Sequence, residues 1–259
     1  MPAKPAQTTM PDPQTAPFLG LRFHQLELGE AASDILASAG GPFKYVVTPN
    51  VQHMVALLEN PERIKPPYLA AWRVLCDSRV LRRLARLSGV KLTVVTGSDL
   101  TAELLTRAAR QGVRVAIIGP TQEDCARLPE LYPGLQFSVY TPPFGFIGSE
   151  LEVARAIAFV VKTAAPLVFL AVGMPQQEQL ARKLLDEPRA TGVGLCIGAS
   201  IDFLTGKQTR APLWMQRAGI EWLHRLATNP IRLGRRYFVE CPKIFYYIYQ
   251  ERRSGQRTP

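Results

Sequence analysis

The 259-residue chain lacks an apolar run long enough to cross a bilayer, although 47% of its residues are hydrophobic. A spanning helix needs about 18 or more consecutive apolar residues, and no stretch of the sequence approaches that length. The first residues, MPAKPAQTTMPDPQTAP, also lack the apolar core of a secretory signal and carry five prolines. We therefore expect a disordered leader over residues 1–17 and a folded chain that does not span a membrane.

Cysteine and histidine are too sparse and too scattered for a metal site. The four cysteines form no Cys-x-x-Cys pair, and only three histidines could add imidazole ligands. Separated thiols of this kind are typical of reduced cysteines in a cytosolic protein. We expect no metal ion and no cofactor. The residues concerned are Cys76, Cys125, Cys196, Cys241, His24, His53 and His224.

Acidic residues are scarce in the last fifth of the chain. From residue 206 to 259, eleven lysines and arginines face three acids, so this segment holds +8 of the net charge of +10. Aromatic residues, including the run IFYYIY at 244–249, interleave with these charges. The pattern favours an amphipathic surface that contacts anionic membrane lipids. Apolar packing beneath solvated charges and binding of single-stranded nucleic acid are the alternatives, in that order.

Short apolar runs alternate with helical patterns through the middle of the sequence. Because most of these runs are continuous rather than alternating, they predict strands that are covered on both faces. The fold class is therefore α/β, with a Rossmann-like, mainly parallel sheet flanked by helices over residues 18–205. The predicted strands are KYVVTPN, KLTVVTG, VRVAIIG, LQFSVYT, PLVFLAVG and GVGLCIGA, beginning at residues 44, 91, 113, 135, 166 and 192.

Residues 206–259 change in character and predict a helical, membrane-associating appendage. One helix is expected to begin at Pro212 and to stop before Asn229-Pro230. A second is expected from Ile231 towards Arg253, bent near Pro242.

Polar residues follow several predicted strands, where parallel sheets gather their ligands. Thr48 and Asn50 can hold a sugar or a diphosphate, and Asp77 can accept a proton from an attacking hydroxyl. Helix capping explains Asn50 and Asp77 equally well at this stage. The chain has neither a Gly-x-Gly-x-x-Gly nor a Walker sequence, so a standard dinucleotide or P-loop site is excluded.

Three later strand ends or turns add candidates of the same kind. The turn at 142–146 can present the Phe146 ring to a base or sugar, or can simply pack. Gln177, after a glycine and a proline, can donate to a phosphate or sugar oxygen. Asp202 can bind a uracil, a ribose hydroxyl or a sugar hydroxyl, and loop or cap chemistry is the alternative for both polar residues.

Taken in order, these segments resemble the WecG/TagA/CpsF glycosyltransferase family. The resemblance rests on GMPQQE at 173–178, GASIDFLTG at 198–206, RAPLW at 210–214, GIEWLHRL at 219–226 and NPIRLGRR at 229–236. The earlier TPN at 48–50, GSDL at 97–100 and YPGLQFSVYTPPFGF at 132–146 agree with it. The match covers most of the chain after the leader.

The resemblance implies an inverting, metal-independent transfer of N-acetylmannosamine or another hexose from a UDP-sugar to a polyprenyl-diphosphate-linked saccharide. It implies a cytoplasmic protein, peripheral on the inner face of the membrane, that makes cell-surface polysaccharide. It assigns the general base to Asp77, and it assigns substrate binding to Thr48, Asn50 and Gln177. Arginines of the appendage are expected to close over the diphosphate, at Arg225, Arg232 and Arg235.

The chain departs from the family at the proposed base. The family commonly has Asp-Gly-x-Gly where this sequence has Asp77-Ser78-Arg79-Val80. A non-catalytic nucleotide-sugar or lipid-phosphate binding protein of the same fold is therefore the alternative. A nucleic-acid-binding function would leave GMPQQE and GIEWLHRL unexplained, so we expect no nucleic acid partner; a homo-oligomer is compatible with the sequence.

Overall fold

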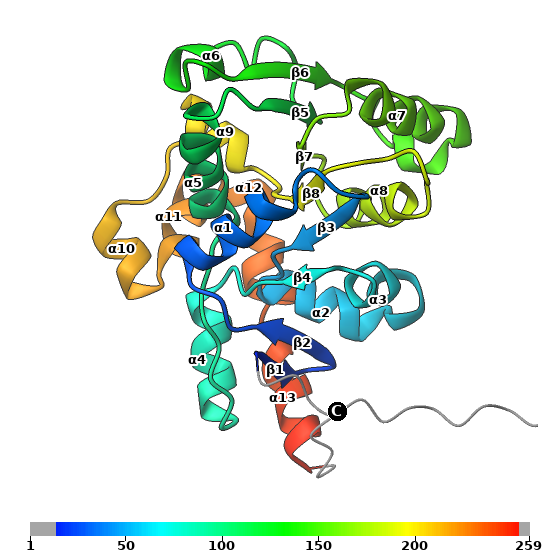
Figure 1. Cartoon of the computed structure of the whole chain (residues 1–259). Helices are drawn as coiled ribbons and strands as arrows, with labels where there is room; N and C mark the ends of the chain where they lie inside the picture. Colours follow the sequence, from blue (N-terminus) through cyan, green and yellow to red (C-terminus); the bar gives the residue numbers. More distant parts are fainter. Residues whose placement is uncertain (1–13, 254–259) are drawn as a thin grey trace, which may run out of the picture.

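A six-stranded sheet forms the centre of the fold (Figure 1). The computed structural model describes residues 14–253. The strand order is β4-β3-β8-β7-β5-β6, and all neighbouring strands are parallel. The strands are β3 (Lys44–Val47), β4 (Arg73–Val74), β5 (Arg114–Ile118), β6 (Gln136–Tyr140), β7 (Leu167–Leu170) and β8 (Val193–Cys196). A separate antiparallel hairpin joins β1 (Thr15–Phe18) to β2 (Leu21–His24).

Helices cover both faces of this sheet, and two apolar clusters fill the space beneath them. In β5, Val115 and Ile117 point into one cluster, whereas Ala116 and Ile118 point into the other. This alternation explains the continuous apolar run and confirms the predicted fold class. The first cluster includes residues of α1 (Leu28–Ser38), α5 (Gly97–Ala109), α6 (Leu128–Leu131) and α9 (Ser200–Thr205). The second includes residues of α2 (Val51–Glu59), α3 (Pro61–Leu69), α4 (Arg79–Leu87), η1 (Phe146–Gly148), α7 (Glu150–Thr163), α8 (Gln176–Leu185) and α13 (Lys243–Arg253).

The C-terminal segment is helical, but its helices are shorter than the sequence predicts. The first expected helix is divided at Gly219, whose φ of 68° ends α10. The second is divided before Pro242. The elements are α10 (Leu213–Ala218), α11 (Glu221–Thr228), α12 (Pro230–Arg235), the π-helical turn η2 (Arg236–Glu240) and α13. No helix within residues 14–253 is long and apolar enough to cross a membrane.

Two local expectations differ from the structure. KLTVVTG at 91–97 is not a strand of the sheet, because its only ladder contact is a single parallel bridge between Val94 and Cys76. The edge position is taken instead by the two-residue strand β4. Strand β1 includes Thr15, Ala16 and Pro17, which the sequence had assigned to the leader; residues 1–13 lie outside the described part of the chain.

Candidate active site

A cavity of about 320 Å³ lies where the carboxyl end of the sheet meets the appendage. Its walls come from the segments after β3 and β4, from the start of α5, and from α10, α11, η2 and α13. This is the crevice in which open parallel sheets bind ligands, here roofed by the appendage. The residues used below are Asn50, Asp77, Arg79, Val80, Leu84, Ser98, Asp99, Arg210, Glu221, Arg225, Arg236, Ile244 and Phe245.

Asp77 is held in this cavity by the backbone of the next segment. The Gly97 N–H donates to Asp77 Oδ1 over 3.1 Å, and Ser78 caps α4 by accepting from the Leu81 N–H. Burial raises the pKa of Asp77 to about 7, against the lowering influence of the Arg225 charge and the Gly97 hydrogen bond. A carboxyl with this pKa exchanges a proton near neutral pH, as a general base must.

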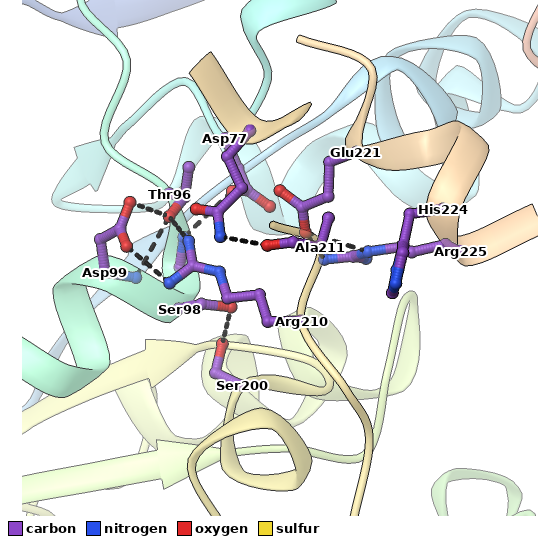
Figure 2. Close-up of polar contacts among 12 residues, drawn as sticks. Asp77, Thr96, Ser98, Asp99, Ser200, Arg210, Ala211, Glu221, His224 and Arg225 are labelled. Carbon is purple, nitrogen blue, oxygen red and sulfur yellow. Dashed lines mark hydrogen bonds and ion pairs between the residues drawn. The ribbon is translucent and has the colours of Figure 1, made fainter. Parts of the chain in front are cut away.

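Arg210 ties the beginning of the appendage to α5 beside Asp77 (Figure 2). Its Nη1 lies 2.7 Å from Asp99 Oδ1, and its Nη2 lies 3.5 Å from Thr96 Oγ1. Thr96 Oγ1 in turn donates to Asp99 Oδ2 over 2.7 Å. Burial by itself would raise the pKa of Asp99, but the bonds from Arg210 and Thr96 bring that pKa below its ordinary value. Asp99 therefore stays ionised and fixes Arg210 in place.

The cavity carries more positive than negative charge. Four arginines and three acids line it, and the acids are Asp77, Asp99 and Glu221. Arg225 is oriented by Glu221, whose Oε1 lies 2.8 Å from its Nη2, and its guanidinium stands 4.7 Å from the centre of the Phe203 ring. Forked guanidinium donors match the oxygens of a diphosphate, so the cavity has the chemistry to bind one.

A second cavity of about 350 Å³ opens at the ends of β5, β7 and β8. Three glycines with positive φ line it: Gly119, Gly173 and Gly198. At Gly119 φ is 133°, and a Cβ would stand 2.7 Å from the Ala171 carbonyl oxygen, so a side chain is excluded. The polar lining includes Asp202 and Lys207, and Lys207 Nζ pairs with Asp124 Oδ1 at 2.7 Å.

A pair of serines connects the walls of the two cavities. Ser98, which lines the first cavity, donates from Oγ to Ser200 Oγ over 3.4 Å (Figure 2). Ser200 directly follows the Gly198-Ala199 wall of the second cavity. The site can therefore hold two ligands side by side, one in each cavity.

The structure brings four of the nine sequence-predicted residues to a cavity wall. Asp77, Asn50 and Arg225 line the first cavity, and Asp202 lines the second. Asn50 also caps α2, because its side chain accepts from the backbone of Gln52 and His53. The capping and ligand-binding explanations of Asn50 are thus compatible.

Three of the other five residues are buried away from both cavities. Thr48 is buried and donates to the Cys196 carbonyl over 3.2 Å, and Phe146 is 2% exposed within the apolar core. Gln177 is also 2% exposed, and its Oε1 accepts from the Gly198 N–H over 3.0 Å. These three residues do not line either cavity.

The remaining two are arginines of the appendage. The Arg235 side chain is 83% exposed and also lies outside both linings. Arg232 belongs to α12, and its side chain falls outside the described residues.

Besides Arg79 of α4, sequence reasoning missed two arginines of the first cavity that belong to the appendage, Arg210 and Arg236. Both stand in segments that carried the family resemblance, RAPLW and NPIRLGRR, so the signal was present. What the sequence could not show is which arginine of the run 232–236 turns inward.

Almost the whole chain matches one known family. Residues 16–258 match the model of the Glycosyl transferase WecG/TagA/CpsF family. The chain belongs to this family.

Two relatives carry the same printed name, N-acetylglucosaminyldiphosphoundecaprenol N-acetyl-beta-D-mannosaminyltransferase. The one from Bacillus spizizenii (strain ATCC 23059 / NRRL B-14472 / W23) is 29% identical over 252 residues, which cover 94% of each chain. The one from Bacillus subtilis (strain 168) is 29% identical over 189 residues, which cover 70% of each chain.

Both cavities fall within the region that matches the family. No group of three or more His, Cys, Asp or Glu side chains placed to hold a metal ion occurs in residues 14–253.

Proposed function

We propose that this protein transfers a sugar from a UDP-sugar to a saccharide carried on polyprenyl diphosphate, with inversion and without a metal ion. N-acetylmannosamine, or another hexose, is the proposed donor sugar. The relatives support this proposal, since their names describe transfer of N-acetylmannosamine to N-acetylglucosaminyl-diphosphoundecaprenol. The observation that carries it is Asp77, a carboxyl with a pKa of about 7 among the arginines of one cavity.

In the proposed reaction, Asp77 takes the proton of an acceptor hydroxyl. The hydroxyl oxygen attacks the anomeric carbon of the donor, and the bond from that carbon to the UDP oxygen breaks. UDP leaves with the electron pair of that bond, and the configuration at carbon inverts because attack and departure occur on opposite faces. The Gly97 N–H, by holding Asp77 Oδ1, leaves the other carboxylate oxygen to receive the proton.

The diphosphates of the two substrates need positive charge, which arginines supply. We assign the acceptor diphosphate to the first cavity, beside Arg225, Arg210 and Arg236. We assign the donor to the second cavity, where three glycines and Lys207 suit a phosphate and Asp202 suits a sugar or base hydroxyl. The Ser98–Ser200 contact then marks the point at which donor sugar and acceptor meet.

A lipid-linked acceptor places the protein at a membrane. Because its C-terminal segment is also basic, we propose that the protein binds peripherally to the inner face of the cytoplasmic membrane. Thr48 and Asn50 support the acceptor side of the site through the segment after β3, and Gln177 supports the donor side through Gly198.

The test is release of UDP from UDP-N-acetylmannosamine and related donors in the presence of a short-chain lipid-diphosphate saccharide. Asp77→Asn should lower kcat by at least about 100-fold, the lower range for loss of a general base. Because only the deprotonated carboxylate accepts a proton, wild-type kcat/KM should fall about tenfold per pH unit below pH 7. A chelator should leave the rate unchanged.

Asp186→Asn is the control, since Asp186 is 63% exposed and pairs with Arg182 at the end of α8. It should keep wild-type activity. Asp77→Asn should not lower the melting temperature at pH 8, because burial disfavours the charged carboxylate that it replaces. An Asp77→Asn protein that turns over normally would remove the base assignment, and binding of donor without transfer by wild type would establish the non-catalytic alternative.

A further inference from the structure

Helix α4 carries an unusual concentration of positive charge for a helix of the catalytic core. Its sequence, RVLRRLARL, contains four arginines and no acid. Leu81, Leu84 and Ala85 are buried, whereas Arg82 and Arg86 are exposed and Leu87 is 71% exposed. The helix is therefore amphipathic, with a basic outer face that ends in an exposed leucine.

Two of the four arginines are engaged with the appendage. Arg79 Nε donates to the Gln216 carbonyl over 2.7 Å, and Arg83 Nη2 donates to the Ala218 carbonyl over 2.8 Å. The side chains of Arg82 and Arg86 make no hydrogen bond or ion pair with another residue between 14 and 253. Since the fold does not use these two charges, they are free to meet an external partner.

Helix α13 continues the surface that α4 begins. Arg252 Nη2 donates to the Leu87 carbonyl, so the far ends of the two helices touch. On α13, Ile244 and Ile248 are buried, whereas Tyr246 and Tyr249 are 58% and 60% exposed. In Figure 1 both helices extend from the same side of the molecule, away from the sheet.

The combined surface has the composition of a membrane contact. Across α4 and α13 there are seven basic residues and one acid, Glu251, which accepts a hydrogen bond from the Leu19 N–H over 3.2 Å. Tyrosine and leucine side chains stand among the charges, as they do where a protein enters the headgroup region. A surface of this charge is complementary to anionic phospholipid.

We propose that the exposed faces of α4 and α13 together form one docking surface for an anionic lipid bilayer. The proposal rests on the proposed function, which requires a lipid-linked acceptor. The sequence predicts a membrane contact for the appendage alone, and this proposal adds a helix of the α/β core to that contact.

The first cavity lies beside both helices of this docking surface. Val80 and Leu84 of α4 and Ile244 and Phe245 of α13 line the first cavity, so it lies between the two helices that contact the bilayer. Helix α4 begins two residues after Asp77. Docking through α4 therefore fixes the distance and orientation of the proposed base relative to the lipid surface.

The test is co-sedimentation of the full chain with vesicles of phosphatidylcholine containing phosphatidylglycerol, and with pure phosphatidylcholine vesicles. Arg82→Gln/Arg86→Gln should reduce the partition onto the anionic vesicles by about 30-fold, since each basic residue near such a surface contributes about fivefold. The control, Arg110→Gln/Lys162→Gln, removes two exposed charges from the ends of α5 and α7 and should partition as wild type.

Activity separates this proposal from the proposed function. The Arg82→Gln/Arg86→Gln protein should transfer sugar to a water-soluble acceptor analogue at the wild-type rate, but should lose activity on acceptor embedded in anionic vesicles. Equal vesicle binding by this variant and by wild type would overturn the docking surface, as would binding of single-stranded oligonucleotide in place of vesicles. If wild type binds vesicles but transfers no sugar to either acceptor, the proposed function fails and the docking surface stands.

Discussion

At the scale of single residues, the first cavity is governed by a balance of opposing influences on Asp77. Burial raises the pKa of its carboxyl, and the Arg225 charge and the Gly97 N–H lower it. A stronger positive charge beside Asp77 would lower its pKa further and make the carboxylate a weak base. Without any positive charge, the carboxyl would stay protonated at neutral pH. Glu221 moderates the balance because it pairs with Arg225 at 2.8 Å and also adds its own negative charge near Asp77.

Two consecutive arginines provide a matched test of diphosphate binding. Arg236 lines the first cavity, whereas Arg235 is 83% exposed and stands 3.7 Å from Glu240. Because Arg236 is assigned to the acceptor diphosphate, Arg236→Ala should raise the acceptor KM by about 10- to 100-fold, the effect of losing one hydrogen bond to a charged group. Arg235→Ala should change the acceptor KM by less than about threefold, because an exposed ion pair contributes little.

Steady-state kinetics with the soluble acceptor analogue would measure both variants. The family resemblance assigns Arg235, not Arg236, to the diphosphate. A larger increase in acceptor KM for Arg235→Ala than for Arg236→Ala would show that the appendage turns on binding and brings Arg235 inward.

At the scale of elements, the start of α8 is coupled to the end of β8 through two buried side chains. Glu178 is 2% exposed, and its Oε1 accepts from Gln177 Nε2 over 2.8 Å. Gln177 Oε1 then accepts from the Gly198 N–H, which belongs to the wall of the second cavity. Burial raises the pKa of Glu178 to about 7, against hydrogen bonds that include one from Gln177. Gln177 is thus a positioning residue for the glycine turn.

Gln177→Ala should leave the Gly198 N–H without its partner and release this turn. We expect the donor KM to rise by about tenfold with little change in the acceptor KM, and the stability to fall by about 1–3 kcal/mol, the cost of an unsatisfied buried group. Donor and acceptor titrations with a urea unfolding curve would measure these effects. Gln177→Glu keeps an oxygen that can accept from the Gly198 N–H, but it places a second carboxyl beside Glu178. Because two carboxylates repel each other once both are ionised, the increase in donor KM for this variant should grow as pH rises. Equal increases in both KM values would contradict a role confined to the donor side.

The elements also show why sequence predicts the fold better than the site. Runs such as PLVFLAVG identify central strands because both faces are buried, and that depends on local composition. KLTVVTG is also rich in β-branched residues, but it contributes to the sheet only the bridge between Val94 and Cys76, so local composition does not decide which runs become strands. Which aromatic ring of the 142–146 turn is buried is likewise a tertiary outcome: Phe144 is fully exposed and Phe146 is in the core.

In the site, too, local sequence predicts some residues and tertiary packing decides the others. Asp77 and Asn50 could be predicted because strand ends of a parallel sheet converge at one edge. Arg210 reaches the cavity from the segment before α10, where it pairs with Asp99, and Arg236 reaches it only after the turn at Gly219, as the appendage folds back over that edge. No spacing in the sequence encodes that return.

At the scale of the whole molecule, the sequence divides the chain at residue 206, but the contacts cross that boundary. Ile244 and Ile248 of α13 are 1% and 7% exposed and belong to the apolar cluster formed with α2, α3 and α4. Lys243 Nζ pairs with Glu59 Oε1 at 2.5 Å. The appendage therefore completes the core as well as covering the site.

We expect the chain cut after residue 229 to be strongly destabilised, beyond any loss of membrane contact. Ile244→Ala/Ile248→Ala, made in the full chain, tests the reason directly. Each truncation of a buried isoleucine costs about 2–5 kcal/mol. At about 2–4 °C per kcal/mol for a chain of this size, the melting temperature of the double variant should fall by about 10 °C or more. Tyr249→Ala, on the exposed face of the same helix, should stay within about 2 °C of wild type.

Thermal unfolding followed by circular dichroism would compare the three proteins with the truncated chain. If the truncated chain melted at the wild-type temperature, residues 230–259 would be separable from the core, as the sequence suggests for the whole segment from residue 206. If it melts lower, as the packing of α13 requires, its disappearance from the membrane fraction cannot be assigned to lost lipid contact, because unfolding alone would produce it. The surface substitutions Arg82→Gln and Arg86→Gln avoid this ambiguity, since they leave the buried face of every helix intact.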